Sequence, residues 1–114
     1  MTTHVLAFVS DLMDRSRISA ALGDDHEVHF VRDTHAIADH ADVRIVVIDL
    51  GAFASCVGPA RAALGPEARI VAFGAHVDGA RLRDATAAGA SNVLPRSRFF
   101  RNVRIAALGP LTDR

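Results

Sequence analysis

Polar residues that could do chemistry stand at the ends of several apolar runs in this sequence. Asp11 follows the first run, Asp49 ends the third, and Arg96 follows the fifth. A carboxylate in such a position could act as a nucleophile or bind a hard divalent cation, and a guanidinium could hold a phosphate. These three residues are therefore the first candidates for a functional site.

Each candidate also has a purely structural interpretation. Asp49 could satisfy loop amides at a strand end. Asp11 could cap a helix with Asp14 in its first turn, and we expect capping to be its main role. Arg96 could pair with Asp49 or Asp11 instead of holding phosphate, because a guanidinium suits bidentate recognition of a carboxylate. We favour that pairing for Arg96.

Short apolar and β-branched runs predict the strands that must position these residues. The strands are predicted at His4 to Ser10, Glu27 to Val31, Val43 to Asp49, Arg69 to Gly74 and Ser91 to Leu94.

Segments with helical spacing separate these runs. They are Leu12 to Leu22, Thr34 to His40, a helix starting only at Pro59, Asp78 to Ala88, and a last helix with Phe100, Val103 and Ala107 on one face. Pro59 sets the start of the third helix, because proline breaks a helix that runs through it.

Regular alternation of strands and helices favours βαβ units with parallel strands. We therefore expect a single α/β domain over residues 1–114. Its predicted architecture is a flavodoxin-like (βα)5 three-layer sandwich, with a parallel five-stranded sheet in the order 2-1-3-4-5. In such a fold the chemistry gathers outside the carboxyl ends of the strands.

Three stretches in the expected order resemble the response-regulator receiver (CheY-like) family. Val46 to Leu50 is similar to its phosphoacceptor strand, and Ile70 to His76 is similar to its fourth strand and turn. Asp84 to Ser97 is similar to its fourth helix, Ala-Gly-Ala turn, fifth strand and Leu-Pro-Lys-Ser ending. The resemblance spans His4 to about Leu108 and implies a signalling domain phosphorylated on an aspartate.

The resemblance implies that Asp49 is the phosphoacceptor. The family's acidic pair after the first strand falls on Val9 and Ser10, or on Ser10 and Asp11 if the loop is shifted by one. At most one acid is retained, so Asp11 and Asp49 would form only a weak Mg²⁺ site.

The residues that hold the phosphoryl group and relay the signal also depart from the family. The family's hydroxyl residue corresponds to Gly74, which is followed by Ala75, and its lysine corresponds to Arg96. The aromatic switch residue corresponds to Val93. Both moving parts of the familiar switch are therefore missing, at Gly74 and at Val93.

These losses predict an atypical receiver, or pseudo-receiver, that signals through protein contact without ordinary phosphotransfer. The expected docking or self-association face comprises the fourth helix, fifth strand and fifth helix, with Ala80, Leu82, Phe99 and Val103. The alternative is a conventional receiver phosphorylated at Asp49 by a histidine kinase. A small enzyme or cofactor binder on the same scaffold ranks lower, because the sequence carries no nucleotide-binding glycine motif.

Composition excludes several other functions. The 13 basic and 13 acidic residues cancel, which argues against binding to nucleic acid or an anionic membrane. The apolar runs are too short to span a bilayer, and the lone Cys56 fits a reducing compartment, so we expect a cytoplasmic protein.

The histidines do not suggest a metal site along the sequence. His26 and His29 are three apart on a predicted strand and face opposite ways, and His35 and His40 are five apart on a predicted helix. We therefore expect no cluster of histidine ligands.

Overall fold

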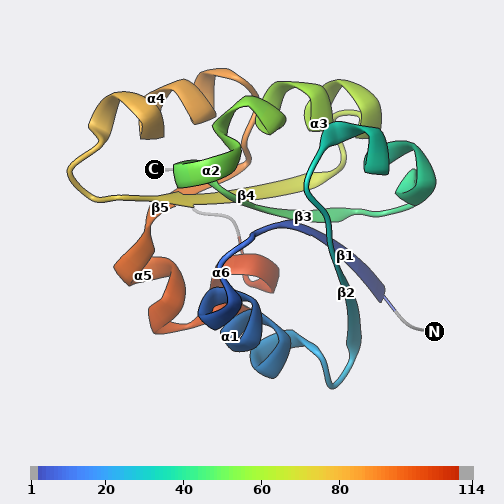
Figure 1. Ribbon diagram of the computed structural model, residues 1–114. Helices are drawn as coiled ribbons and strands as arrows, with labels where there is room; N and C mark the ends of the chain where they lie inside the picture. The colour runs from blue at the N-terminus through green and yellow to red at the C-terminus, as the bar shows by residue number, and fades with distance from the viewer. Residues whose placement is uncertain (1–2, 111–114) are drawn as a thin grey trace.

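The computed structural model describes residues 3–110 and contains one parallel sheet with the order β2-β1-β3-β4-β5. The sheet is sandwiched between two layers of helices (Figure 1). The strands are β1 (Thr3–Phe8), β2 (His26–Phe30), β3 (Ile45–Asp49), β4 (Arg69–Gly74) and β5 (Asn92–Pro95). The predicted fold class and strand order are confirmed.

Each strand is followed by one or more helical segments. They are α1 (Leu12–Leu22), the 3₁₀ helix η1 (Thr34–His40), α2 (Leu50–Phe53), the 3₁₀ turn η2 (Ala54–Cys56), α3 (Val57–Leu64), α4 (Gly79–Ala87), α5 (Arg96–Arg101) and α6 (Val103–Leu108). No helix within residues 3–110 is long and apolar enough to cross a membrane.

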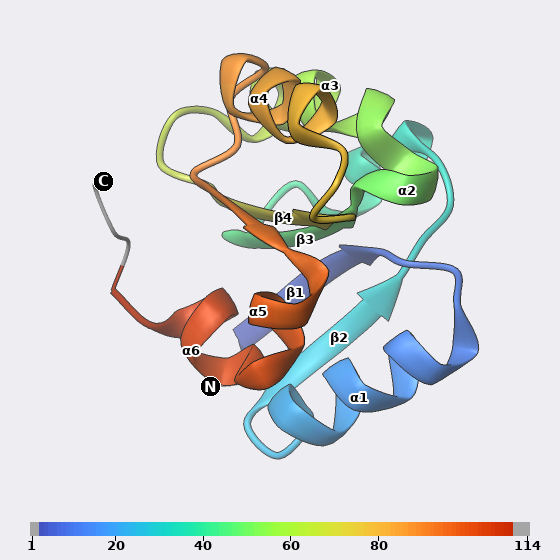
Figure 2. The ribbon, with the colours of Figure 1, turned by 90° about the vertical axis from the view of Figure 1, so that its left-hand side faces the viewer.

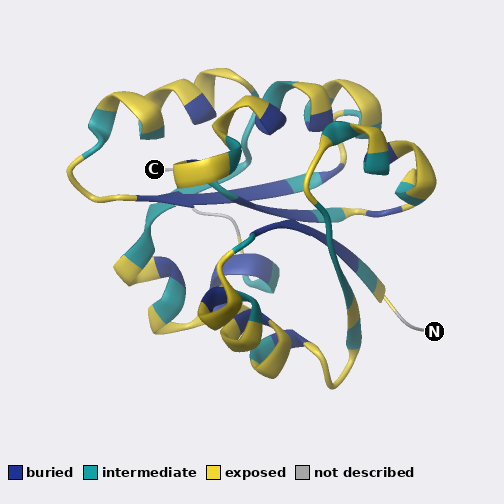
Figure 3. Cartoon of the chain, in the orientation of Figure 1, coloured by how far each residue is buried: buried dark blue, intermediate teal, exposed yellow. Residues whose placement is uncertain are grey.

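Alternating side chains of the strands build two separate cores. Leu6, Phe8 and Ile48 belong to the core under η1, α2, α3 and α4, whereas Val5 and Val47 belong to the core under α1, α5 and α6. This follows from the two-residue period of a strand. Figure 2 shows these two helical layers on opposite faces of the sheet. The central strands are buried along almost their whole length (Figure 3).

Some helix boundaries differ from the predictions for identifiable reasons. The segment Thr34–His40 has the predicted bounds but is a 3₁₀ helix. Helix α3 starts at Val57, before the predicted start at Pro59. The helix tolerates Pro59 because this residue lies in the first turn, where a proline removes no intrahelical hydrogen bond. The last helix is divided at Asn102, which has extended backbone and accepts a hydrogen bond of 3.1 Å from the Ile105 amide.

Arg61 fixes the turn that leads into β5. Its guanidinium donates to the carbonyl oxygens of Gly89 (2.9 Å), Gly65 and Ala68 (both 2.7 Å) and to the Ser91 hydroxyl (3.0 Å). Gly89 has a φ of 116°, and a Cβ there would lie 2.8 Å from Cγ of Arg61. The turn therefore requires glycine both for its backbone conformation and for space.

Candidate functional site

Asp49 lies at the carboxyl end of β3, where a parallel sheet of this topology opens its crevice. Its Oδ1 accepts a hydrogen bond of 2.9 Å from the Gly51 amide, so Asp49 caps α2 directly. The side chain is half-buried, and burial raises the pKa of its carboxyl above the ordinary value. One carboxylate oxygen of Asp49, the candidate nucleophile, is thus already hydrogen-bonded to the backbone that follows it.

Asp11 has the capping role that the sequence predicts. Its Oδ1 accepts a hydrogen bond of 2.9 Å from the Asp14 amide at the start of α1. Asp14 itself is only 3% exposed and is the one buried charged residue within residues 3–110. A buried carboxylate needs a partner, because desolvation strongly disfavours an isolated charge.

Arg96 supplies that partner. Its Nη2 and Nη1 donate to the two carboxylate oxygens of Asp14 at 2.8 and 3.0 Å. The guanidinium also lies over the rings of Phe73 and Phe100, and its hydrogen bonds to Asp14 raise its pKa. The predicted structural pairing of Arg96 is correct, but the predicted partners, Asp49 and Asp11, are wrong. Asp14 lies in the first turn of α1 and is one of the buried residues of that helix.

Gly74, at the end of β4, leaves only tight space for a side chain, which two leucines would have to yield slightly to admit. A Cβ at this position would lie 3.2 Å from Cδ2 of Leu82 and 3.3 Å from Cβ of Leu50. Leu50 follows Asp49 immediately and is 1% exposed. The hydroxyl position of the resembled family is therefore filled from both sides by leucine side chains, whereas the following Ala75 is exposed.

An arginine of α4 ties that helix to the residue after Asp49. Arg81 donates through Nη1 to the Leu50 carbonyl oxygen at 3.2 Å, and its Nε lies 3.2 Å from the Asp78 carboxylate. This contact holds α4 against α2 on the same side of the sheet. It reinforces the packing of Leu50 and Leu82 over Gly74.

Val93 lies on β5, paired with Ala72 of β4. Its side chain is half-buried and packs against the core under α4. The switch position of the resembled family is thus occupied by a small packed side chain.

The residues that follow β1 contribute Asp11 as a possible second carboxylate for a cation at Asp49, but Val9 contributes none. Val9 is fully buried in the core, and its carbonyl oxygen accepts a hydrogen bond of 2.6 Å from Nε of Arg15. Asp11 and Asp49 each use an oxygen for a backbone amide, and neither joins a group of three or more ligand side chains within residues 3–110. Two carboxylates without a third ligand would hold Mg²⁺ only weakly.

Exposed apolar side chains flank Asp49 in the order of the sheet, a feature that sequence reasoning missed. Leu12 and Met13, after β1, are 77% and 73% exposed, and Val77, after β4, is 87% exposed. Leu12 and Met13 begin α1 directly after β1, and Val77 lies in the loop after β4, so these side chains follow the two strands that neighbour β3. Exposed apolar groups that gather at one edge mark a candidate protein-contact surface.

The predicted docking face needs a correction. Phe99 and Val103 are 0% and 6% exposed and belong to the core under α5 and α6, so they cannot line a surface. Phe99 stacks on Phe73 with ring centroids 4.6 Å apart. Ala80 is exposed and Leu82 is half-buried. Of the four residues predicted to line the docking face, Ala80 is therefore the exposed one.

Comparison with solved structures confirms the resemblance at the level of the fold. A response regulator from Burkholderia pseudomallei, solved with a phosphorylated aspartic acid, a calcium ion and citrate, superposes with a TM-score of 0.73 and 18% identity. The match covers 92% of this chain and 66% of that protein. A response regulator from Thermotoga maritima matches with a TM-score of 0.71 and 16% identity, covering 91% of this chain and 96% of that one.

A third similar structure is a CheY-like protein, TadZ, from Pseudomonas aeruginosa. Its TM-score is 0.71 at 16% identity, with 84% of this chain and 88% of that chain covered. No protein-family model and no curated protein matches the sequence. The chain has the fold of response regulator receiver domains, and at these identities the likeness concerns the fold alone.

Proposed function

We propose that this chain is a single receiver-like domain that acts in signal transduction through protein contact, without ordinary phosphotransfer. The observation that carries the proposal is the packing of the Leu50 and Leu82 side chains against Gly74. A Cβ at position 74 would lie 3.2 to 3.3 Å from Leu82 and Leu50, so a phosphate-sensing hydroxyl residue would fit there only if these leucines shifted.

The charge arrangement supports the same proposal. In ordinary receiver chemistry a cation neutralises the incoming phosphoryl oxygens. Here the guanidinium of Arg96 is held by both oxygens of the buried Asp14 carboxylate. Redirecting it to a phosphoryl group on Asp49 would leave Asp14 buried without its partner, which is energetically costly. The Asp14–Arg96 pair therefore stabilises an unphosphorylated arrangement.

The alternative function is a conventional receiver that a histidine kinase phosphorylates at Asp49. Its support is the position of Asp49 at the end of β3 and its half-exposed side chain. Mg²⁺ at Asp11 and Asp49 would be needed for this chemistry.

The intact mass after incubation with Mg²⁺ and a small-molecule phosphodonor tests between the two functions. We expect no phosphoryl adduct on the natural chain, while an ordinary receiver treated in parallel is labelled. The control is Asp49→Asn, because asparagine keeps a capping side chain but cannot be phosphorylated. An adduct on the natural chain that is absent from Asp49→Asn would overturn the proposal and favour the conventional receiver.

For the protein contact, we propose self-association through α4, β5 and α5. Ala80 is the exposed residue of this face that we would change first. Light scattering should detect a dimer of the natural chain, and Ala80→Arg should shift it toward monomer because a guanidinium would be placed in the contact. Ala20→Arg is the matched control, because Ala20 is an exposed alanine of α1.

A different partner would use another surface. If the natural chain is monomeric at high concentration, self-association is excluded. The edge with Leu12, Met13 and Val77 then becomes the candidate contact for a different protein. Serine substitution of these residues should weaken capture of that protein, whereas serine substitution of Ile105, which is 62% exposed on α6, should not.

We further propose that the chain has no catalytic activity of its own and works in the cytoplasm. The support for the location is the lone Cys56, which is buried in the core as a thiol. A flavodoxin-like scaffold that binds a cofactor is the lower alternative, and a tightly bound chromophore in the purified protein would favour it.

A further inference from the structure

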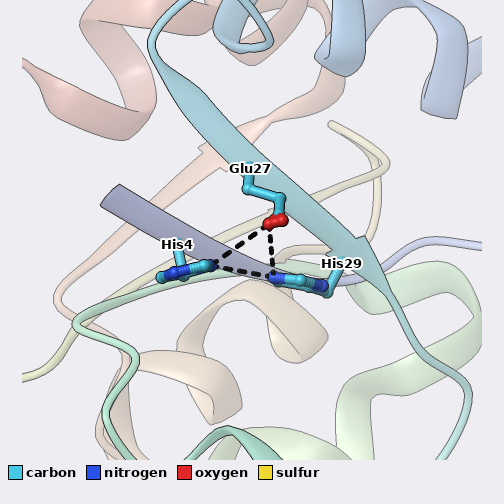
Figure 4. Close-up of side chains that lie close together, drawn as sticks. All are labelled: His4, Glu27 and His29. Carbon is cyan, nitrogen blue, oxygen red and sulfur yellow. Dashed lines mark hydrogen bonds and ion pairs between the residues drawn. The ribbon is translucent and has the colours of Figure 1, made fainter. Parts of the chain in front are cut away.

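Two histidines and a glutamate converge on one face of the sheet at strands β1 and β2. Nδ1 of His4 lies 3.0 Å from Nε2 of His29, and Oε1 of Glu27 lies 3.7 and 4.0 Å from these two nitrogens. Figure 4 shows the three side chains pointing toward one another from the two strands. Within residues 3–110, these are the side chains that meet as a potential group of metal ligands.

The parallel register explains why they meet. His4 pairs with Glu27, and Leu6 pairs with His29, so the three side chains lie on the same face at adjacent positions. His26 belongs to the same strand but faces α1. The prediction that the histidines form no cluster is therefore wrong. It compared histidines within one segment, whereas the cluster forms between residues 25 apart in sequence.

The spacing of the three ligand atoms suits a transition metal ion. The circumradius of a triangle with sides of 3.0, 3.7 and 4.0 Å is about 2.1 Å. Zinc bonds to imidazole nitrogen and to carboxylate oxygen are about 2.0 to 2.2 Å long. A tetrahedral ion with bonds of this length has ligand atoms about 3.4 Å apart, so the observed separations of 3.0 to 4.0 Å require only small adjustments of the side chains.

The donors and their exposure point to the same kind of ion. Two imidazoles and one carboxylate suit Zn²⁺, whereas Mg²⁺ and Ca²⁺ prefer oxygen ligands alone. The side chains of His4, Glu27 and His29 are 40%, 50% and 28% exposed, so an ion can enter from solvent. His40 of η1 packs its ring 4.6 Å from that of His29 and supports its orientation.

We propose that His4, Glu27 and His29 bind a zinc ion that joins β1 to the edge strand β2, with water in the fourth coordination position. The site lies in the amino-terminal part of β1, whereas Asp49 lies at the carboxyl end of β3, so it is independent of the proposed signalling function. Zinc would replace the His4–His29 hydrogen bond and stabilise the pairing of the two strands.

Titration calorimetry of the full chain, prepared without an affinity tag, tests the site with ZnCl₂. We expect one ion per chain. Loss of one ligand in His29→Gln or Glu27→Gln should weaken binding by more than about tenfold, since even residues outside the ligand shell can be worth 10–100-fold. His26→Gln is the matched control, because it removes a histidine from the same strand but from the opposite face.

A second readout guards against variants that do not fold. Zn²⁺ should raise the melting temperature of the natural chain and of His26→Gln, but not of His29→Gln, and Mg²⁺ should raise none of them. Co²⁺ should give the visible absorption of a tetrahedral site in the natural chain and in His26→Gln, but not in His29→Gln. Absence of zinc binding by the folded natural chain, or equal zinc binding by folded His29→Gln, would overturn the proposal.

Discussion

Arg96 and Asp14 form a bidentate ion pair that joins the start of α5 to the first turn of α1. The pair crosses the edge of the sheet where Asp49 stands, and its acid is almost completely buried. The guanidinium of Arg96, a group that could bind phosphate, is therefore used to hold α5 against α1.

Replacement of Arg96 by methionine should therefore destabilise the fold. Asp14 would remain buried without a partner, and breaking a fully buried pair costs about 3–5 kcal/mol. Because solvent reaches nearly half of the Arg96 side chain, we expect a loss of about 2 kcal/mol in the free energy of unfolding. Urea denaturation measures this loss.

Arg104→Met is the control for that experiment. Arg104 forms an equally bidentate pair with Asp25, with both distances 3.0 Å, but this pair is exposed. Its loss should leave the free energy of unfolding almost unchanged. Equal losses in the two variants would contradict the assignment of a special role to the buried pair.

Gly74→Ser should also be destabilising, although it restores a hydroxyl of the kind the resembled family carries. Its Cβ would crowd Leu50 and Leu82, and overpacking of this kind costs about 1–3 kcal/mol. Combining it with Leu82→Ala should recover part of this loss, which a double-mutant cycle measures. Gly58→Ser is the control, since nothing lies within 4 Å of a Cβ at Gly58.

The raised pKa of Asp49 predicts a pH dependence of stability. A carboxyl whose pKa is raised in the folded state stabilises the fold below its ordinary pKa of 3.8, and this contribution is lost as the pH rises through the folded-state pKa. Asp49→Asn removes the titration and keeps a cap. It should be more stable than the natural chain near neutral pH, and the difference should shrink toward about pH 4. A difference independent of pH would contradict the burial of this carboxyl.

Arg61→Met should weaken the connection between α3 and β5. The substitution keeps an apolar stem but leaves three carbonyl oxygens and the Ser91 hydroxyl without their donor. We expect a loss of roughly 2–3 kcal/mol in the free energy of unfolding. Arg83→Met, at an exposed position of α4, should have little effect in the same thermal or urea denaturation.

The fold could be predicted because its signals are local. Apolar runs fix the strands, and capping residues such as Asp11, Asp33 and Asp78 mark the starts of helices, where each accepts an amide hydrogen bond. Asn102 is a capping residue of the same kind. Its signal was present in the sequence, but the apolar spacing of Phe100 and Val103 continues across it and conceals the break.

The site was less predictable because it depends on contacts between distant segments. The Asp14–Arg96 pair spans 82 residues, and two other aspartates, Asp11 and Asp49, are equally suitable partners in the sequence. The filling of the space at Gly74 depends on Leu82, whose place over β4 no local pattern gives. The burial of Phe99 depends on its stacking with Phe73. The histidine cluster requires the register of β1 against β2.

The packing over Gly74 also constrains how this sequence can change over generations. A single substitution that introduces a hydroxyl at position 74 brings its Cβ close to two leucine side chains, and we expect it to lower stability before it can bring any benefit. A smaller residue would have to arise first at position 50 or 82, where it would leave a cavity. Each path back to a phosphate-sensing switch therefore begins with a harmful step, which makes the loss of the hydroxyl difficult to reverse.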